Sequence, residues 1–270
     1  MPQIDTSNAE LLGLKGLHLW HAPLSSCSQR VRLVLAERGL NYESHLVNLE
    51  EGEHASEAYQ AIHPKGLVPA LVDEGELFVE SIDIIKHLAG DTAALTSADA
   101  DLLALADGAQ LDLKLLTFEF LFRGGPPPSE AKQKAFQQTH KNAWLKQFYT
   151  DFAAGFERAR IEHAVRRTDA GFQVLEARLA DGRAYLSGDA FSLSDIAWLP
   201  NAHRFALMGW PFEQMPYLGA WFERVKERPC YAEALLNWQP SAVQNAFAAY
   251  TNQRRKEGTD VRAFGGLTTL

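Results

Sequence analysis

Cysteine is scarce in this chain: there are two among 270 residues, Cys27 and Cys230, and they lie far apart in the sequence. A chain so poor in cysteine is not expected to depend on disulfides, so both thiols should be free and reduced. Long apolar runs are lacking as well, and none reaches the roughly 20 residues of a membrane-spanning helix. The N-terminus has no charged and then apolar pattern of a secretory signal. We therefore expect a cytoplasmic protein that does not contact membranes.

Basic residues are outnumbered by acidic ones. Lys and Arg total 26 against 34 Asp and Glu, which gives a formal net charge of −8. Nucleic-acid binding usually needs a clustered basic surface, so this balance argues against a nucleic-acid partner. A local basic pocket for a small anionic ligand stays compatible with it. Long biased tracts are also lacking, and 46% apolar residues are enough to bury the core of one large domain or two ordinary ones.

The first part of the chain contains an alternation of strand and helix patterns. Strands are expected at 17–21, 42–48, 70–73 and 76–79, and helices at about 27–38, 56–62 and 81–88. Glu74-Gly75, between the last two strands, is a hairpin signal. This order predicts an α/β domain over residues 16–90. An extension, residues 1–15, precedes it, and we assign it little structure and no function.

After Gly90 the strand signals disappear and helical periodicity takes over. The pattern predicts an all-helical domain over residues 98–240, with helices at 102–122, 130–167 (where a break is allowed), 169–179 and 217–228. Ser192 and Asp195 have the spacing of a capping box, which starts a helix and is a folding feature. Residues 241–270 are polar and rich in Gly and Thr toward the end, so we expect a tail that wraps or frays.

Cys27 stands in a small polar cluster, Ser25 to Ser28, at the point where a strand turns into a helix. Helix N-termini carry unsatisfied N–H groups and a partial positive charge, which favour an anion or a thiolate. Cys27 is therefore a candidate reactive thiol, with a buried and inert cysteine as the alternative. Arg30 and Arg32 lie within two turns of it, and we expect both to face water.

Cys230 and His21 are two further residues whose side chains we first interpret as packed in the core. Cys230 follows Pro229 near a helix end, and we interpret it as structural. His21 closes the first predicted strand, beside Trp20. It can act in proton transfer at a cleft, although a lone histidine beside a tryptophan is more often packed.

Val68-Pro69 stands at the entry of a predicted strand. A proline at this place either starts the strand in the ordinary way or marks a tight cis turn. A cis turn would expose the N–H and C=O of the preceding residue, so that a bound peptide could pair with them like an extra strand. The sequence leaves both alternatives open.

Four motifs in this order resemble the cytosolic glutathione transferases: Ser25-Ser26-Cys27-Ser28, Lys65 to Leu71, Glu80-Ser81, and Phe191 to Ala197. The resemblance covers roughly residues 17 to 238. It implies a thioredoxin-like α/β N-terminal domain followed by an all-α C-terminal domain. Within the superfamily the serine and cysteine cluster with its following arginines is similar to the zeta class. The insertion at 124–149 and the closing Asn237-Trp238 are similar to glutathione-dependent tetrachlorohydroquinone dehalogenases.

The resemblance implies that glutathione is the cosubstrate and that no metal takes part. Val68, before Pro69, would hydrogen-bond the cysteinyl part of the tripeptide through its backbone. Glu80 would meet the γ-glutamyl ammonium, and Ser81 would receive its carboxylate at a helix N-terminus. Lys65 would pair with a glutathione carboxylate, with a solvated loop lysine as the alternative.

The sulfur end of that site leaves two alternatives. In serine-type members a hydroxyl stabilises the glutathione thiolate, and Ser25 is the matching residue. In cysteine-type members the protein thiolate forms or receives a mixed disulfide, and Cys27 matches that position. His21 and a set of helical residues would line the electrophile side of the cleft if the insertion folds as a lid: Phe118, Phe122, Arg123, Trp144, Phe148 and Tyr149.

The resemblance implies an enzyme that conjugates or reduces a small hydrophobic, aromatic electrophile with glutathione. Such an activity belongs to detoxification or to aromatic catabolism. A zeta-like cis-trans isomerase of a maleyl-type acid and a non-catalytic glutathione-binding adaptor are the alternatives, because fold does not fix function. The resemblance also implies a homodimer. The natural electrophile is not contained in the sequence.

Overall fold

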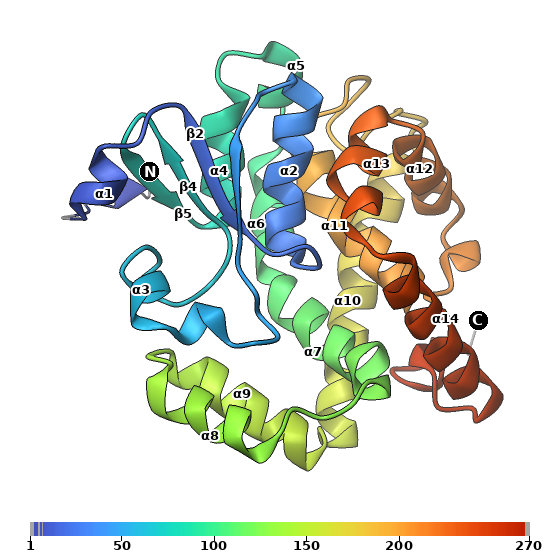
Figure 1. Cartoon of the computed structure of the whole chain (residues 1–270). Helices are drawn as coiled ribbons and strands as arrows, with labels where there is room; N and C mark the ends of the chain where they lie inside the picture. Colours follow the sequence, from blue (N-terminus) through green and yellow to red (C-terminus); the bar gives the residue numbers. More distant parts are fainter. Residues whose placement is uncertain (1–2, 5, 7, 268–270) are drawn as a thin grey trace.

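The first part of the molecule is built on a five-stranded sheet (Figure 1). The computed structural model describes residues 3–4, 6 and 8–267. The strand order is β1-β5-β4-β2-β3, in which β2 and β3 are parallel and the other pairs are antiparallel. The four strands after β1 lie where the sequence predicts them: β2 (Leu17–His21), β3 (Glu43–Leu46), β4 (Ala70–Asp73) and β5 (Glu76–Val79).

The turn between β4 and β5 follows the predicted hairpin. Glu74 has φ 48° and Gly75 has φ 88°. Two successive residues with positive φ suit the right-handed twist of the flanking strands, which explains why a glycine is placed there. A side chain at Gly75 would also meet the backbone of Leu12, because its Cβ would lie 2.6 Å from the Leu12 carbonyl oxygen.

The N-terminal extension is more ordered than the sequence indicates. β1 (Gln3–Ile4) pairs antiparallel with β5, and α1 (Ala9–Leu12) buries Leu11 against one face of the sheet. The expectation of little structure in residues 1–15 is therefore wrong for 3–4 and 8–12, because an unpaired strand edge and an apolar patch on the sheet stabilise them. Residues 1, 2, 5 and 7 lie outside the described residues.

The two faces of the sheet bury different partners. Leu19, Leu71 and Phe78 point into the large core, where they meet α2 (Ser26–Arg38), α4 (Ser81–Ala89) and the helical part of the chain. The alternate residues of β4 and β5 point to the other face and pack with Leu11. A short 3₁₀ turn, η1 (Glu53–Ala55), and α3 (Glu57–Gln60) connect β3 to β4. The sheet is thus covered by helices chiefly on the side that faces the second part of the molecule.

Every element after residue 90 is helical within the described residues. The fold is thus the predicted α/β part followed by a helical part, while the domain limits 16–90 and 98–240 stay a prediction. The helices are α5 (Ala93–Thr96), α6 (Ala100–Gly108), α7 (Gln110–Phe120), α8 (Glu130–Thr139), α9 (Ala143–Ala154), α10 (Arg158–Leu179), α11 (Leu193–Leu207), α12 (Pro216–Lys226), α13 (Pro229–Ala234) and α14 (Ser241–Lys256).

Several helix limits differ from the prediction. The run 102–122 is divided at Ala109, and the run 130–167 contains two breaks. The first break has a local cause, because the side chain of Asn142 accepts a hydrogen bond from Leu145 N and starts α9. Gly155, with φ 93°, ends α9. No break separates 167 from 169, since α10 runs through both residues.

The C-terminal segment folds back onto the helices. α14 follows η4 (Leu236–Trp238), and Phe247, Phe264 and Leu267 are buried. Thr251 Oγ1 donates to the Leu207 carbonyl at 3.1 Å, which joins α14 to the end of α11. Of the two alternatives for this tail, wrapping is the one that the structure shows for 241–267, because its buried apolar residues pack into the core of the helical part. Residues 268–270 lie outside the described residues.

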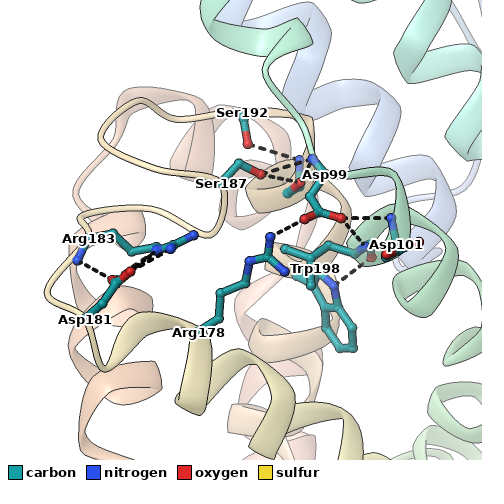
Figure 2. Close-up of polar contacts among 10 residues, drawn as sticks. Asp99, Asp101, Arg178, Asp181, Arg183, Ser187, Ser192 and Trp198 are labelled. Atoms are coloured by element: carbon teal, nitrogen blue, oxygen red, sulfur yellow. Dashed lines mark hydrogen bonds and ion pairs between the residues drawn. The ribbon is translucent and has the colours of Figure 1, made fainter.

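Polar contacts join α6, α10 and α11, as Figure 2 shows. The N–H of Asp99 donates to Ser187 Oγ and Ser194 Oγ, and the Asp99 carboxylate pairs with Arg178. The predicted capping box is confirmed at the start of α11, where the Ser192 N–H donates to Asp195 Oδ2 at 2.9 Å. Asp195 also accepts a hydrogen bond from the Trp221 indole at 2.8 Å. Its buried carboxylate is thereby satisfied from several segments.

Within the described part of the chain, no helix is both long and apolar enough to cross a membrane. A search of the same residues finds no group of three or more His, Cys, Asp or Glu side chains placed to hold a metal ion.

Candidate active site

The sheet register brings three separate segments to one end of the strands. Trp20 is paired with Ala70, and Ala70 is paired with Val79. Three segments meet at this row. They are the start of α2, which follows β2, the turn 68–69, which precedes β4, and the start of α4, which follows β5. We call residues 25–27, 68–69 and 80–81 the strand-end site. It contains six of the site residues that the sequence singles out: Ser25, Cys27, Val68, Pro69, Glu80 and Ser81.

The start of α2 is formed by Ser25. Its backbone is extended (φ −70°, ψ 120°), and its Oγ accepts a hydrogen bond from Ser28 N at 3.2 Å. Ser25 is therefore the N-cap of α2. The hydroxyl proton of Ser25 is not used by this contact, so it can still be donated to a ligand. Cys27 lies in the first turn and is half-buried.

Gln110, the first residue of α7, contacts the start of α2. Its Oε1 accepts hydrogen bonds from Ser26 Oγ at 2.7 Å and from Cys27 Sγ at 3.5 Å. Its Nε2 donates to Asn201 Oδ1 at 2.7 Å, which fixes the orientation of the amide. No sequence motif identifies Gln110, because the contact joins residues more than 80 positions apart.

The turn before β4 has a cis peptide bond between Val68 and Pro69, which selects the second of the two alternatives. Within the described residues, the backbone N–H and C=O of Val68 have no hydrogen-bond partner. The preceding loop is well held, because the Tyr59 hydroxyl donates to the Leu67 carbonyl at 2.6 Å. The turn therefore presents a free donor and acceptor from a fixed support.

Glu80 and Ser81 form the third segment. Glu80 has φ 67°, a left-handed backbone that costs a residue with a side chain about 1–3 kcal/mol and often marks a functional site. Its carboxylate pairs with Lys65 Nζ at 2.6 Å, in a contact largely open to solvent. Ser81 starts α4, which has no side-chain cap. The first N–H groups of α4 therefore remain available to an anion.

Arg30 is buried behind Ser81, so the expectation that it faces water is wrong. Its Nη1 donates to Ser81 Oγ at 3.2 Å, and its other nitrogens donate to the carbonyls of Ala197 at 2.9 Å and Ala106 at 2.7 Å. Burial lowers the pKa of Arg30, against the opposing effect of Cys27 and Asp107. Arg30 thus orients Ser81 and joins α2 to two helices of the second part.

Arg32 is buried as well, and His21 lies against it. Arg32 Nη1 contacts His21 Nδ1 at 3.0 Å, and the His21 Nε2 contacts Ser44 Oγ at 2.8 Å. Burial, with the charge of Arg32, lowers the pKa of His21 to about 3. His21 has no exposed surface and does not line an open site, so its assignment to the electrophile cleft is corrected to packing. Trp238 packs edge-on against it at 4.8 Å.

Cys230 is buried, and burial raises the pKa of its thiol to about 12. A neutral thiol in such a place behaves as a small apolar group. The structural interpretation of Cys230 agrees with this placement.

The predicted cleft aromatics form one cluster around Phe118. Its ring packs edge-on against those of Phe122, Phe148 and Tyr149, with centroids 4.9 to 5.5 Å apart. Arg123 turns away from it: its Nε donates to Glu119 Oε2 at 2.7 Å, and its Nη1 donates to the Phe152 carbonyl. Arg123 therefore supports the helix pair through these contacts, and its Nη2 is buried without a hydrogen-bond partner among the described residues.

Helices α8 and α9 contact the α/β part across from α7, in the lower part of Figure 1. His140, between them, contacts the Gly66 carbonyl through Nε2 at 3.2 Å, while its Nδ1 accepts from Asn142 N. Gln60 Nε2 donates to the Thr139 carbonyl at 3.2 Å. The insertion thus docks on the loop that precedes Val68, a contact that the sequence did not reveal.

Two models of protein families match this chain. The model "Glutathione S-transferase, N-terminal domain" matches residues 24–90, and "Glutathione S-transferase, C-terminal domain" matches residues 158–224. Glutathione S-transferase 3 of Zea mays is 31% identical over 240 residues, which cover 81% of this chain and 93% of the relative. Glutathione S-transferase TCHQD of Arabidopsis thaliana is 25% identical over 245 residues, which cover 81% and 89%. Maleylacetoacetate isomerase of Pseudomonas aeruginosa is 54% identical over 67 residues, 24% of this chain and 32% of the relative.

Solved structures share the architecture. Beta-etherase LigF from Sphingobium sp. superposes with a TM-score of 0.68 at 21% identity, over 81% of this chain and 98% of that one. A maleyl pyruvate isomerase described as a zeta-class bacterial glutathione S-transferase superposes with a TM-score of 0.59 at 25% identity, over 83% and 98%. The sheet followed by helices and the strand-end site, taken together with these likenesses, place this chain in the glutathione S-transferase family.

Proposed function

We propose that this chain binds glutathione across the strand-end site and uses it to conjugate or reduce a small hydrophobic, aromatic electrophile. The observation that carries the proposal is the paired row Trp20, Ala70 and Val79, which brings a thiol, a free backbone pair and a carboxylate to one place. Family membership supports glutathione as the cosubstrate.

The tripeptide fits the three segments by its chemistry. The free N–H and C=O of Val68 would pair with the cysteinyl residue like a neighbouring strand. The γ-glutamyl carboxylate would lie at the uncapped start of α4 and accept from the Ser81 hydroxyl, whose oxygen Arg30 orients. Glu80 would take the ammonium group, and Lys65, released from Glu80, a carboxylate.

The proposed sulfur chemistry has a conjugation step, which a reductive branch can follow. The glutathione thiolate attacks an electrophilic ring carbon: a C–S bond forms, and the halide leaves with its electron pair. In a reductive branch, the Cys27 thiolate then attacks the sulfur of the conjugate, the C–S bond breaks, and the ring carbon takes up a proton. A second glutathione thiolate cleaves the resulting Cys27–glutathione disulfide, which gives oxidised glutathione and restores Cys27.

The catalytic roles of Ser25 and Cys27 can be distinguished by variants that destabilise the N-cap of α2 as little as possible. Because Ser25 caps α2, its replacement by alanine would cost about 1 kcal/mol of stability, whereas glycine costs only a few tenths. The assay is glutathione-dependent turnover of Ser25→Gly, Ser25→Thr and Cys27→Ser on a chloronitrobenzene and on a glutathione mixed disulfide. Loss of disulfide turnover in Cys27→Ser alone assigns the reductive chemistry to Cys27. Loss of conjugation in Ser25→Gly, restored in Ser25→Thr, assigns the thiolate to Ser25.

Two other functions are tested by the same proteins. The high local identity to maleylacetoacetate isomerase favours a cis-trans isomerase of a maleyl-type acid as the second candidate. Isomerase turnover that survives Cys27→Ser, with no conjugation, would establish it. Glutathione binding without turnover of any electrophile would instead indicate an adaptor.

We further propose a cytoplasmic homodimer, as the family resemblance implies. Sedimentation of the full chain tests the dimer, and a monomer at micromolar concentration would contradict it.

A further inference from the structure

Lys114, on α7, lies on an aromatic surface one turn after Gln110. Its Nζ is 5.4 Å from the ring centroid of Phe148, 5.7 Å from that of Trp144 and 5.9 Å from that of Phe118. The side chain is half-buried. Within the described residues its ammonium has no hydrogen bond and no carboxylate partner. The sequence gives no signal for this position, because the three rings come from two helices.

The groups that face Lys114 come from several elements. Its charge acts on His54 of η1 and on His140 between α8 and α9, and the charge of Cys27 acts on Lys114 itself. Lys114 follows Gln110, which contacts the start of α2, by one turn of α7, and two of its three neighbouring rings, Trp144 and Phe148, belong to the insertion. Phe136, on α8, connects η1 to α9: its ring centroid lies 5.4 Å from that of His54 and 4.7 Å from that of Tyr149.

An ammonium group in this setting is incompletely compensated. Ring quadrupoles attract a cation, but each such contact replaces only part of the hydration that burial removes. Burial lowers the pKa of Lys114 to about 8, against the opposing effect of Cys27. Purely structural lysines of this chain are satisfied differently: Lys146 Nζ, for example, donates to the Gln137 carbonyl at 3.1 Å. The incompletely compensated charge of Lys114 lies one turn along α7 from Gln110, which contacts the Cys27 thiol at 3.5 Å.

We propose that Lys114 is the anion-binding group of the electrophile site and that this site takes an aromatic electrophile bearing a carboxylate. Phe118 and Trp144, which keep exposed ring surface, would accept the ring, and the ammonium would pair with the carboxylate. The inference rests on the proposed function, since it names the substrate class of that same site.

The test compares two electrophiles of similar shape, one charged and one neutral: a chloronitrobenzoate and the matching chloronitrobenzamide, each referred to its own wild-type rate. We expect Lys114→Met to lower kcat/KM for the benzoate about 10-fold or more, the usual size of a charge-assisted contact. The benzamide should change by less than about 3-fold. Lys114→Arg should retain most of the benzoate activity. Lys134→Met, an exposed charge removal on α8, is the matched control and should leave both substrates unchanged.

Binding is measured separately from turnover, by quenching of tryptophan fluorescence with the unreactive nitrobenzoate and nitrobenzamide. Equal losses on both electrophiles in Lys114→Met, or a benzoate preference that persists in it, would overturn the inference and leave the proposed function intact. If the wild type turned over neither compound but bound nitrobenzoate through Lys114, the anion site would stand and the proposed function would fail.

Discussion

The thiol of Cys27 donates a hydrogen bond to the side-chain oxygen of Gln110, with 3.5 Å between Sγ and Oε1. The two residues lie 83 positions apart and come from the two parts of the molecule. Because Asn201 holds the amide nitrogen of Gln110, the oxygen is the atom that faces the thiol. A thiol that donates this hydrogen bond is less available as a nucleophile.

Replacing Gln110 should therefore change the reactivity of Cys27 in opposite directions. Gln110→Met removes the acceptor, so alkylation of Cys27 by iodoacetamide at neutral pH should be about 2- to 10-fold faster, the range of one net hydrogen bond. Gln110→Glu places a negative charge beside the thiol and should slow it. The rates are measured by mass spectrometry of the peptide that contains Cys27. Slower alkylation in Gln110→Met would show that the amide donates to the thiolate instead.

Gly66 controls how closely the insertion approaches the strand-end site. It has φ +59°, and a Cβ at this position would lie 2.7 Å from His140 Nε2 and 2.7 Å from the His54 carbonyl oxygen. Gly66→Ala should therefore cost about 1–3 kcal/mol in the free energy of unfolding and loosen residues 129–154. Hydrogen exchange of that segment measures the loosening.

Gly52→Ala is the matched control for this prediction. Gly52 also has a positive φ, +74°, but nothing lies within 4 Å of a Cβ there. It should show the backbone strain without loosening the insertion. Equal exchange in both variants would contradict a steric contact between Gly66 and His140.

The buried Arg30 should be important for stability. Arg30→Met removes a buried charged donor from the carbonyls of Ala106 and Ala197, so we expect the free energy of unfolding to fall by about 2–5 kcal/mol. Urea unfolding at neutral pH measures this. Arg166→Met, on an exposed pair with Glu162 at 3.9 Å, should change it by less than about 1 kcal/mol. A loss for Arg30→Met as small as that of the control would show that apolar packing replaces the contacts.

His203 should make the protein less stable in mild acid. Burial, reinforced by Arg204 and Lys226, lowers the pKa of His203 to about 3, and its ring nitrogens contact the Tyr231 hydroxyl and Gln239 at 2.7 Å. Between about pH 6.5 and pH 3 the unfolded chain binds a proton at this histidine that the folded chain does not. The free energy of unfolding therefore falls as the pH falls through this range.

The contribution is isolated by His203→Gln, which cannot titrate. Between pH 7 and pH 5 the wild type should lose about 2 kcal/mol more than the variant. Urea unfolding at the two pH values gives the difference. If the free energy of unfolding fell equally in the two proteins, His203 would bind a proton as readily in the folded chain as in the unfolded chain, which would contradict the prediction.

Elements whose causes are local could be predicted without the structure. The alternation in 17–21, the turn at Glu74-Gly75 and the spacing of Ser192 and Asp195 each depend on neighbours within a few residues, and all three appear in the structure. The order of the motifs was enough to indicate the family. It also placed Ser25 and Cys27 correctly at the start of a helix.

Which polar side chains are buried, and what they contact, could be seen in the folded molecule alone. Arg30 looked like a surface residue because sequence patterns carry no information about carbonyls 76 and 167 positions away. Gln110 and Lys114 carry no motif, and they gain a role because α7 lies opposite the start of α2. Local periodicity fixes a helix and its apolar face. The partners of a charge depend on how separate segments pack, and that is settled when the whole chain buries its core.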